Sequence, residues 1–312
     1  MTTPIVAIVG PTGVGKSDLA IRVATTLGES GTPAEIINAD AMQLYAGMDI
    51  GTAKVSEPER AGISHHLLDV WPVSQEASVA DYQTLAREAI SRCHERGVIP
   101  LLVGGSGLYV SSVLYDFDFP GTDPEVRQAL EERLQEEGVE VLVAELREKD
   151  PEAAEAIDPR NSRRIVRALE VIQITGKPFG AGLHARSTLW REPVLVMGLR
   201  LERPLLSRAL EERVERMWES GLVEEVQGLL AGPKPLGVTA AQAIGYRQVV
   251  EYLDGTMTRA EAVAETVSLT KRYARRQMSW FRRDPHITWR DVDQVSSTAL
   301  VDEVVTWVAS SQ

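Results

Sequence analysis

The stretch Gly10-Pro11-Thr12-Gly13-Val14-Gly15-Lys16-Ser17 fits the pattern G-x-x-x-x-G-K-S/T of a phosphate-binding loop. An apolar, β-branched run over residues 5–9 precedes it, and a helical pattern of apolar residues follows it and ends at Gly28. A strand, a loop and a helix in this order present backbone N–H groups and the positive end of a helix to phosphate oxygens. Lys16 then reaches the outer phosphates, and the Ser17 hydroxyl is a ligand for Mg²⁺. The stretch predicts a site for a diphosphate or a triphosphate, with Mg²⁺ as cofactor.

Short apolar strands alternate with helices before Pro120, where the character of the sequence changes. From residue 121 to residue 176 the pattern is almost entirely helical and rich in Glu and Arg, and an apolar strand returns only at 193–199. Unbroken apolar strands that alternate with helices are typical of a parallel sheet covered by helices. Strands are expected at 5–9, 34–40, 98–103 and 193–199, and helices at 81–96, 205–230, 239–253 and 259–283.

The length of 312 residues agrees with a prior of about two domains. We predict an α/β fold in which residues 1–120 and 191–312 form a phosphate-loop core with a mostly parallel sheet flanked by helices. Residues 121–190 are predicted to form an inserted all-helical domain.

The composition is that of an ordinary globular protein, with a formal net charge of −12 and one cysteine, Cys93. A single cysteine is typical of a reducing compartment, and no apolar run reaches the about 18 residues of a membrane span. We therefore expect a cytoplasmic protein that has no membrane segment and no signal peptide. The acidic balance argues weakly against a nucleic-acid partner, so the placement of the basic residues decides that question.

Two strand ends carry candidate catalytic groups. Asp40 ends the second strand, at the edge of the sheet where ligands bind in open α/β folds. A Mg²⁺ ligand, a general base and a turn-forming aspartate are all compatible with this position. The third strand opens onto Gly104-Gly105-Ser106-Gly107, where a phosphohydrolase would carry an acidic residue. The glycines instead allow a ligand to approach the backbone closely, and Ser106 presents a hydroxyl.

The pair His65-His66 invites a metal interpretation. Adjacent residues in a strand point to opposite faces, however, and no Cys or His partner lies at ligand spacing. We expect structural histidines here, and a small buried residue at Cys93.

Basic residues gather in two stripes. On one predicted helix Arg160, Arg163, Arg164 and Arg167 lie within about 100° of arc. Between residues 271 and 283 there are six basic residues and no acidic ones, within about 140° of arc on a continuous helix. A solvated face explains one such stripe, but two in a chain with 45 acidic residues indicate a phosphate-backbone partner. The other side of the second stripe is expected in the core and holds Tyr273, Met278, Trp280 and Phe281.

Seven motifs occur in sequence order from about residue 5 to residue 285. They are GPTGVGKS from Gly10, DAMQLYAGMDIGTAK from Asp40, HHLLD from His65, LLVGGSGLY from Leu101, SRRIVRALEV from Ser162, IGYRQ from Ile244 and KRYARRQMSWFRR from Lys271. As a set they resemble the bacterial tRNA dimethylallyltransferases, also called tRNA isopentenyltransferases.

The resemblance implies transfer of a dimethylallyl group from dimethylallyl diphosphate to N6 of the adenosine 3′-adjacent to the anticodon, in tRNAs that read codons beginning with U. The products are N6-(dimethylallyl)adenosine and diphosphate. It further implies that the phosphate loop holds the diphosphate of the donor without hydrolysing ATP. The inserted domain is then expected to clasp the anticodon stem-loop.

Residue by residue, the resemblance makes Asp40 the general base that hydrogen-bonds the adenine amine. Ser106, where the family usually has threonine, becomes the hydroxyl that orients the reacting groups. The expected diphosphate site is Gly10 to Ser17 with Arg213, and Ser17 is the expected metal ligand. The expected tRNA contacts are Asp40, Ala41, Met42, Gln43, Ser106, Arg127, Arg163, Arg164, Ile165, Val166, Arg167, Gln242, Ala243, Ile244, Gly245, Tyr246 and Arg247, to which the second stripe adds Lys271, Arg272, Arg275 and Arg276.

Two departures from the family pattern, at Ala41 and at Ser106, bear on the expectations. Ser106 keeps the hydroxyl of the usual threonine but loses the methyl group that restricts its rotamer, and neither departure is expected to abolish activity. Ala41 replaces the serine that commonly follows the catalytic aspartate, so any contact from that hydroxyl is absent. The cysteine-rich zinc finger of eukaryotic relatives is missing, so no zinc is expected. A monomer is expected because the chain has no sustained heptad and no broad exposed apolar face.

Two functions of other classes compete with this one. A small-molecule or nucleoside kinase would use the same loop for ATP, but it has no use for two arginine stripes. A nucleotide-gated RNA-binding module without covalent chemistry would leave Asp40 and the GGSGLY turn without a role.

Overall fold

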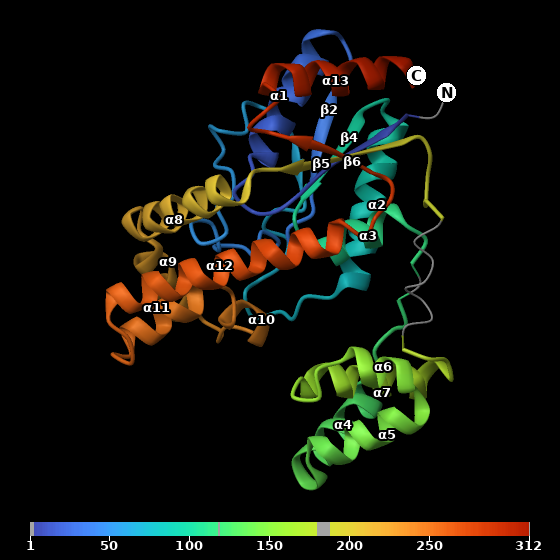
Figure 1. Cartoon of the computed structure of the whole chain (residues 1–312), viewed down its shortest axis with the longest axis vertical. Helices are drawn as coiled ribbons and strands as arrows, with labels where there is room; N and C mark the ends of the chain where they lie inside the picture. Colours follow the sequence, from blue (N-terminus) through green and yellow to red (C-terminus); the bar gives the residue numbers. More distant parts are fainter. Residues whose placement is uncertain (1–2, 118, 180–187, 312) are drawn as a thin grey trace. The chain divides into compact units, whose positions relative to one another are not determined.

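The computed structural model describes residues 3–117, 119–179 and 188–311. The chain divides into two compact units, Met1–Leu114 with Arg191–Gln312 and Tyr115–Trp190 (Figure 1). The first unit contains the sheet and the second is helical, which confirms the predicted fold class. The inserted domain was expected to begin at residue 121, whereas the helical unit begins at Tyr115. Residues 180–187 of the expected range lie outside the described residues.

A six-stranded parallel sheet forms the centre of the first unit, in the order β3-β2-β4-β1-β5-β6. Strand β1 lies between β4 and β5, with Ile8 opposite both Val103 and Met197. Because the strands are parallel, their carboxyl ends meet at one edge, and the loop after β1 lies between the ends of its two neighbours. The strands are β1 (Ile5–Val9), β2 (Ala34–Asn38), β3 (His65–His66), β4 (Ile99–Gly104), β5 (Val194–Arg200) and β6 (Ile287–Asp291).

Helices cover both faces of this sheet (Figure 1). On one face α1 and α13 pack against β1, and Leu19 and Val304 share a core with Val6 and Ile8. Helix α2 contacts β2 and β4 and covers the other face, toward which alternate strand residues such as Ala7 point. The helices of this unit are α1 (Lys16–Glu29), α2 (Val79–Glu95), α3 (Gly107–Leu114), α8 (Arg203–Glu219), α9 (Leu222–Leu230), α10 (Val238–Ala241), α11 (Tyr246–Leu253), α12 (Arg259–Phe281) and α13 (Ser297–Ser310).

Helix α12 is continuous from Arg259 to Phe281 and so carries the second basic stripe except its last two arginines, whereas the predicted helix ran to residue 283. Its start is set by Thr258 and Glu261, which exchange hydrogen bonds between side chain and backbone in a capping box. The predicted helices 205–230 and 239–253 are each divided into two, at Ser220-Gly221 and around Gly245. These divisions let α8 and α11 pack against α12, and α9 pack against α8 and α11.

The helical unit contains α4 (Pro124–Glu137), α5 (Val139–Lys149), α6 (Pro151–Ala156) and α7 (Ser162–Thr175). Leu130, Leu142, Leu146, Ile165 and Leu169 form its own core. Helix α4 ends before Gly138, which also precedes α5, and α6 begins at Pro151. In the described part of the chain, every helix is too short or too polar to cross a membrane.

Candidate active site

The phosphate loop leaves β1 at Gly10, where only glycine fits. Its φ is 144°, and a Cβ on Gly10 would lie 2.4 Å from the carbonyl oxygen of Leu199 on β5. The backbone N–H groups from Gly13 to Ser17 have no acceptor among the described residues. Because α1 begins at Lys16, these donors and the positive end of the helix lie together. This is the arrangement that phosphate oxygens require.

Lys16 is the half-buried cation of this loop. Its Nζ donates to the carbonyl oxygen of Pro11 at 2.7 Å. Burial lowers the pKa of Lys16 to about 8; the negative charge of Asp40 raises it, and the positive charge of Arg213 lowers it. These interactions show that the lysine, the aspartate and the arginine share one electrostatic environment.

Asp40 follows β2 at the same edge of the sheet. Its backbone N–H donates to Asn38 Oδ1 at 3.0 Å, and its own Oδ1 accepts the Met42 N–H at 3.0 Å. The aspartate therefore forms a turn, which was one of its predicted alternatives, with one carboxylate oxygen. Its Oδ2 has no hydrogen-bond partner in the ranges that the structure describes. One oxygen fixes the side chain, and the other is available to a ligand.

Ser106 joins the ends of β2 and β4. Its Oγ accepts the Ala41 N–H at 3.1 Å and lies 3.4 Å from the hydroxyl oxygen of Tyr273. Burial and the charge of Asp40 raise the pKa of Tyr273 to about 12, so this phenol stays protonated at neutral pH. Tyr273 was predicted in the core. The structure instead places its ring half-buried beside Ser106, because α12 crosses the strand ends.

Arg213 reaches the site from α8. Its Nη2 donates to the carbonyl oxygen of Thr52 at 3.4 Å, and burial lowers its pKa, while Asp40 raises it. The loop that carries Thr52 is itself fixed by Glu225, whose carboxylate accepts the backbone N–H groups of residues 49–51 and the Tyr246 hydroxyl. Arg213 therefore interacts electrostatically with Lys16 and Asp40, and two cations at one place can hold a diphosphate.

Gln277 is a residue of this site that the sequence analysis did not select. It is 4% exposed, its Oε1 accepts the Thr12 N–H at 2.9 Å, and its Nε2 donates to the Gly105 carbonyl at 2.9 Å. One side chain of α12 thus holds the phosphate loop and the turn before Ser106. The available signal was a polar residue on the otherwise apolar side of an amphipathic helix.

The second basic stripe divides into two rows along α12 and the turn that follows it at Arg282 and Arg283. Lys271, Arg275 and Arg282 line a cavity of about 870 Å³, together with Pro11 of the phosphate loop and Met278. Lys271 also pairs with Glu211 of α8. The next row, Arg272, Arg276 and Arg283, is exposed, and the Arg276 guanidinium lies 5.7 Å from the centroid of the Tyr273 ring.

The remaining apolar side of α12 contains one core residue and two contact residues. Phe281 is buried as predicted, whereas Met278 lines the cavity and Trp280 is only half-buried. The Trp280 Nε1–H donates to Ser111 Oγ at 3.2 Å, and its ring covers Gly107, where a Cβ would lie 2.2 Å from it. The helix therefore closes over α3 as well as over the phosphate loop.

In the helical unit, the expected tRNA contacts fall into three groups. Arg163 and Arg164 are exposed on α7. Arg127 and Arg167 both pair with the buried carboxylate of Glu170. Burial raises the pKa of Glu170, but the two arginines outweigh burial, so this pKa lies below its usual value. Ile165 and Val166 have side chains in the core of the unit, which are closed to any partner.

The expected tRNA segment 242–247 is also mostly enclosed. Gln242 is exposed, but Ala243, Gly245 and Tyr246 are buried beneath α9 and α12. Arg247 is half-buried and pairs with Glu265 at 2.7 Å. The segment shapes the loop after Asp40, since a Cβ on Gly51 would lie 2.4 Å from the Tyr246 ring.

His66 gains two neighbours that its sequence spacing did not indicate. Ligand atoms of Glu35, His66 and Cys93 lie within 4.8 Å of one another. Arg96 donates to both oxygens of Glu35, at 2.8 and 2.6 Å, and burial raises the pKa of Cys93 to about 12. The carboxylate is satisfied and the thiol is protonated, so this cluster is an ion-pair network, as expected for structural histidines.

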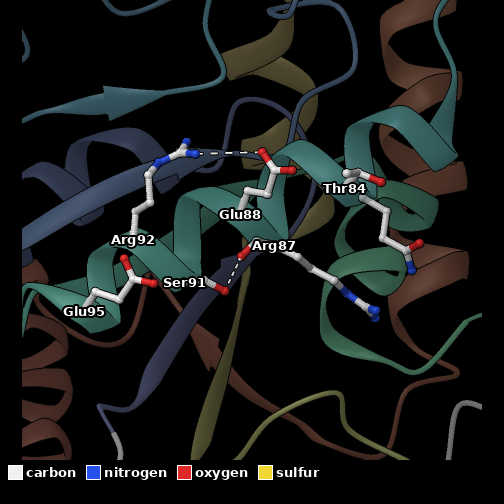
Figure 2. A pocket seen from close by; sticks show the side chains of 7 residues that line it. Thr84, Arg87, Glu88, Ser91, Arg92 and Glu95 are labelled. Carbon is white, nitrogen blue, oxygen red and sulfur yellow. Dashed lines mark hydrogen bonds and ion pairs between the residues drawn. The ribbon is translucent and has the colours of Figure 1, made fainter.

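A hollow of about 460 Å³ lies on the exposed side of α2 (Figure 2). All of its residues come from one helix, and Arg92 pairs with Glu88 at 3.8 Å within it. Its charges compensate one another, and it is separate from the strand ends, so it is not a candidate active site. The lining residues are Gln83, Thr84, Arg87, Glu88, Ser91, Arg92 and Glu95.

Ser17 fits the position of a Mg²⁺ ligand. Its hydroxyl is half-buried, directly follows Lys16, and has no hydrogen-bond partner in the described part of the chain. Hard oxygen donors of this kind, with phosphate oxygens and water, are the ligands that Mg²⁺ prefers.

Comparisons with known proteins cover nearly the whole chain. The model of the family described as IPP transferase matches residues 43–284. The chain is 56% identical to a tRNA dimethylallyltransferase of Thermobifida fusca over 93% of this chain and 90% of that protein. It is 53% identical to a tRNA dimethylallyltransferase of Streptomyces coelicolor over 91% of this chain and 89% of that protein.

Solved structures agree with these relatives. A tRNA isopentenylpyrophosphate transferase of Bacillus halodurans matches with a TM-score of 0.70 and 39% identity, covering 99% of this chain and 96% of that one. A eukaryotic dimethylallyltransferase acting on tRNA matches with a TM-score of 0.81 and 25% identity, covering 100% of this chain and 81% of that one.

Proposed function

Since this chain belongs to the IPP transferase family and is a tRNA prenyltransferase, we propose that it transfers the dimethylallyl group of dimethylallyl diphosphate to N6 of the adenosine 3′-adjacent to the anticodon. The acceptors are tRNAs that read codons beginning with U. The observation that carries the proposal is the convergence of Lys16, Asp40 and Arg213 at one edge of the sheet. Two cations and a loop of free N–H groups suit a diphosphate, and a carboxylate beside them suits an acceptor.

The donor is held by its leaving group. As the C–O bond of the allylic carbon breaks, its electron pair leaves with the diphosphate, and negative charge builds on the phosphate oxygens. The loop N–H groups, Lys16 and Arg213 face that charge. Lys16 and Arg213 are half-buried and the loop N–H groups are held by the backbone, so little reorganisation is needed as the bond breaks.

The acceptor amine needs help of a different kind. The lone pair of adenine N6 is delocalised into the ring, so N6 becomes a good nucleophile only as it loses a proton. The Oδ2 of Asp40 takes that proton while the N6–C bond forms. Ser106 and the protonated Tyr273 lie at this side of the site and orient the base.

Mg²⁺ is proposed as the cofactor, held by the Ser17 hydroxyl and the diphosphate of the donor. When bound, it neutralises charge on the leaving group. We propose no role for zinc.

The tRNA is proposed to bind through exposed cations of both units. On α12 these are Arg272 and Arg276, and on α7 they are Arg163 and Arg164. The target base must leave its stack, at a cost of a few kcal/mol that contacts to the phosphate backbone offset. We propose that the protein acts as a monomer and that it works in the cytoplasm.

A double-label experiment tests the function. The protein is incubated with unmodified tRNA, Mg²⁺ and either ATP labelled in its γ-phosphate or dimethylallyl diphosphate labelled in its prenyl group. We expect label in tRNA only from the prenyl donor, and none when the target adenosine is replaced by guanosine. Label transfer from ATP with none from the prenyl donor would instead make the chain a kinase. A kinase is not favoured, because the relatives are named as tRNA dimethylallyltransferases.

A further inference from the structure

The side chain of Gln277 touches both halves of the proposed site. Its carboxamide oxygen accepts the Thr12 N–H of the phosphate loop, and its carboxamide nitrogen donates to the Gly105 carbonyl, both at 2.9 Å. Thr12 lies in the loop after β1, and Gly105 directly follows the neighbouring strand β4. The amide therefore spans the donor side and the acceptor side of the strand ends.

The fit of this amide is tight. Gln277 is 4% exposed, and a Cβ on Gly105 would lie 2.3 Å from its Nε2. Both hydrogen bonds use backbone groups, so the amide sets the distance between two main-chain segments and not between two side chains. Only a side chain with one donor and one acceptor at its end makes both bonds.

Ser106 directly follows the carbonyl that Gln277 holds. The same turn of α12 carries Tyr273, whose hydroxyl oxygen lies 3.4 Å from Ser106 Oγ, and Ser106 Oγ in turn accepts the N–H of Ala41, next to Asp40. The position of the base relative to the phosphate loop thus depends on a chain of contacts that begins at Gln277.

We propose that Gln277 is a positioning residue that fixes the separation between the diphosphate loop and the acceptor groups around Asp40 and Ser106. The proposal rests on the function proposed above. Gln277 does not touch either substrate; it acts through the two backbone segments. Since a misplacement of about 1 Å between reacting groups costs about 10²-fold in rate, loss of the amide affects the chemical step more than substrate binding.

Gln277→Met tests this in the full-length protein. The substitution keeps the length and burial of the side chain but removes both hydrogen bonds. We expect the single-turnover rate of prenyl transfer to fall about 10²-fold, with the Kd for tRNA within about threefold of wild type, since the exposed arginines are unchanged. Thr266→Val is the matched control, because Thr266 is a buried polar residue of the same helix whose hydroxyl bonds only to Ala262. It should keep the wild-type rate.

Gln277→Glu provides a second test, which remains available if the Gln277→Met variant does not fold. An ionised carboxylate keeps the acceptor for Thr12 but opposes the Gly105 carbonyl, whereas a protonated carboxyl donates to it as the amide does. Burial raises the pKa of such a carboxyl. The ratio of the variant rate to the wild-type rate should therefore rise as the pH falls from about 8 to about 6, a response that simple loss of stability does not produce.

The outcomes separate failure of the positioning role from failure of the proposed function. A Gln277→Met rate within about threefold of wild type, or a pH-independent rate ratio for Gln277→Glu, would overturn the positioning role while the wild type still transfers label. A loss of tRNA binding equal to the loss of rate would also overturn it. If the wild-type protein itself transfers no prenyl label, the proposed function fails, and the role of Gln277 fails with it.

Discussion

The buried amine of Lys16 makes donor binding depend on pH in the alkaline range. In the free protein, burial lowers the pKa of Lys16 from 10.5 to about 8. A diphosphate bound beside the amine adds negative charge and raises that pKa again. Binding then takes up a proton, so donor affinity is constant below pH 8 and falls as the pH rises through that value.

The size of the effect follows from the shift. With a free-state pKa of about 8, the Kd of dimethylallyl diphosphate rises about tenfold between pH 7 and pH 9, and about thirtyfold by pH 9.5. The largest possible rise in Kd corresponds to a bound donor that returns the pKa of Lys16 from about 8 to 10.5. That rise is about 300-fold, or about 3 kcal/mol of binding free energy. The donor does not contribute, because its phosphate groups lose their last proton at about pH 6.

Titration calorimetry of dimethylallyl diphosphate with Mg²⁺ from pH 7 to pH 9.5 measures this directly. Lys16→Met should bind weakly with no pH dependence, and Lys16→Arg should also give a flat profile, since a guanidinium stays charged over the whole range. A wild-type Kd that is constant from pH 7.5 to pH 9.5 would refute the reasoning. A slope that persists in Lys16→Met would assign the titration to another group.

Three more predictions concern other parts of the chain. Asp40→Ala should keep tRNA binding but lower the single-turnover rate by about 10²-fold or more, as for a lost general base; near-normal chemistry in that variant would remove Asp40 from the role. Glu170→Ala leaves two guanidinium groups of the helical unit without their shared buried partner, and should destabilise that unit by about 2 kcal/mol. Hydrogen exchange of the α4 and α7 amides measures the loss, and Glu152→Ala, at the exposed start of α6, should show none. Arg272→Gln combined with Arg276→Gln should weaken tRNA binding and reduce the slope of log Kd against log salt by about 1–2; an unchanged slope would place the RNA elsewhere.

Much of the fold was predictable because its signals are local. The strand, loop and helix around Gly10 to Ser17 form from residues that are neighbours in sequence, and their pattern is complete within 25 residues. The sheet strands that are buried on both faces have continuous apolar runs. Strand β6 was missed, because its sequence Ile-Thr-Trp-Arg-Asp is half polar and becomes a strand only by pairing with β5.

The candidate site was predictable in its residue types but not in its connections. Lys16, Asp40 and Ser106 each follow a strand, so their common edge could be inferred from a parallel sheet. Helix α12 was predicted correctly from its charges, but the prediction that Tyr273 lies in the core was wrong. Periodicity separates the polar side of a helix from the apolar side, but it does not show which other part of the protein each side contacts.

By itself, the sequence determined where the phosphate loop lies, which strand ends carry Asp40 and Ser106, and that arginines gather on two helices. Only the tertiary structure decided that α12 crosses those strand ends, that Gln277 links Thr12 to Gly105, and that Arg127 and Arg167 are held by Glu170. The physical reason is the separation along the sequence of the residues that interact. Backbone conformation and amphipathic faces follow from neighbours a few residues apart. The contacts of Gln277 and the pairing of Arg127 with Glu170 instead join positions 43 to 265 residues apart, and they form only after the core has brought the chain segments together.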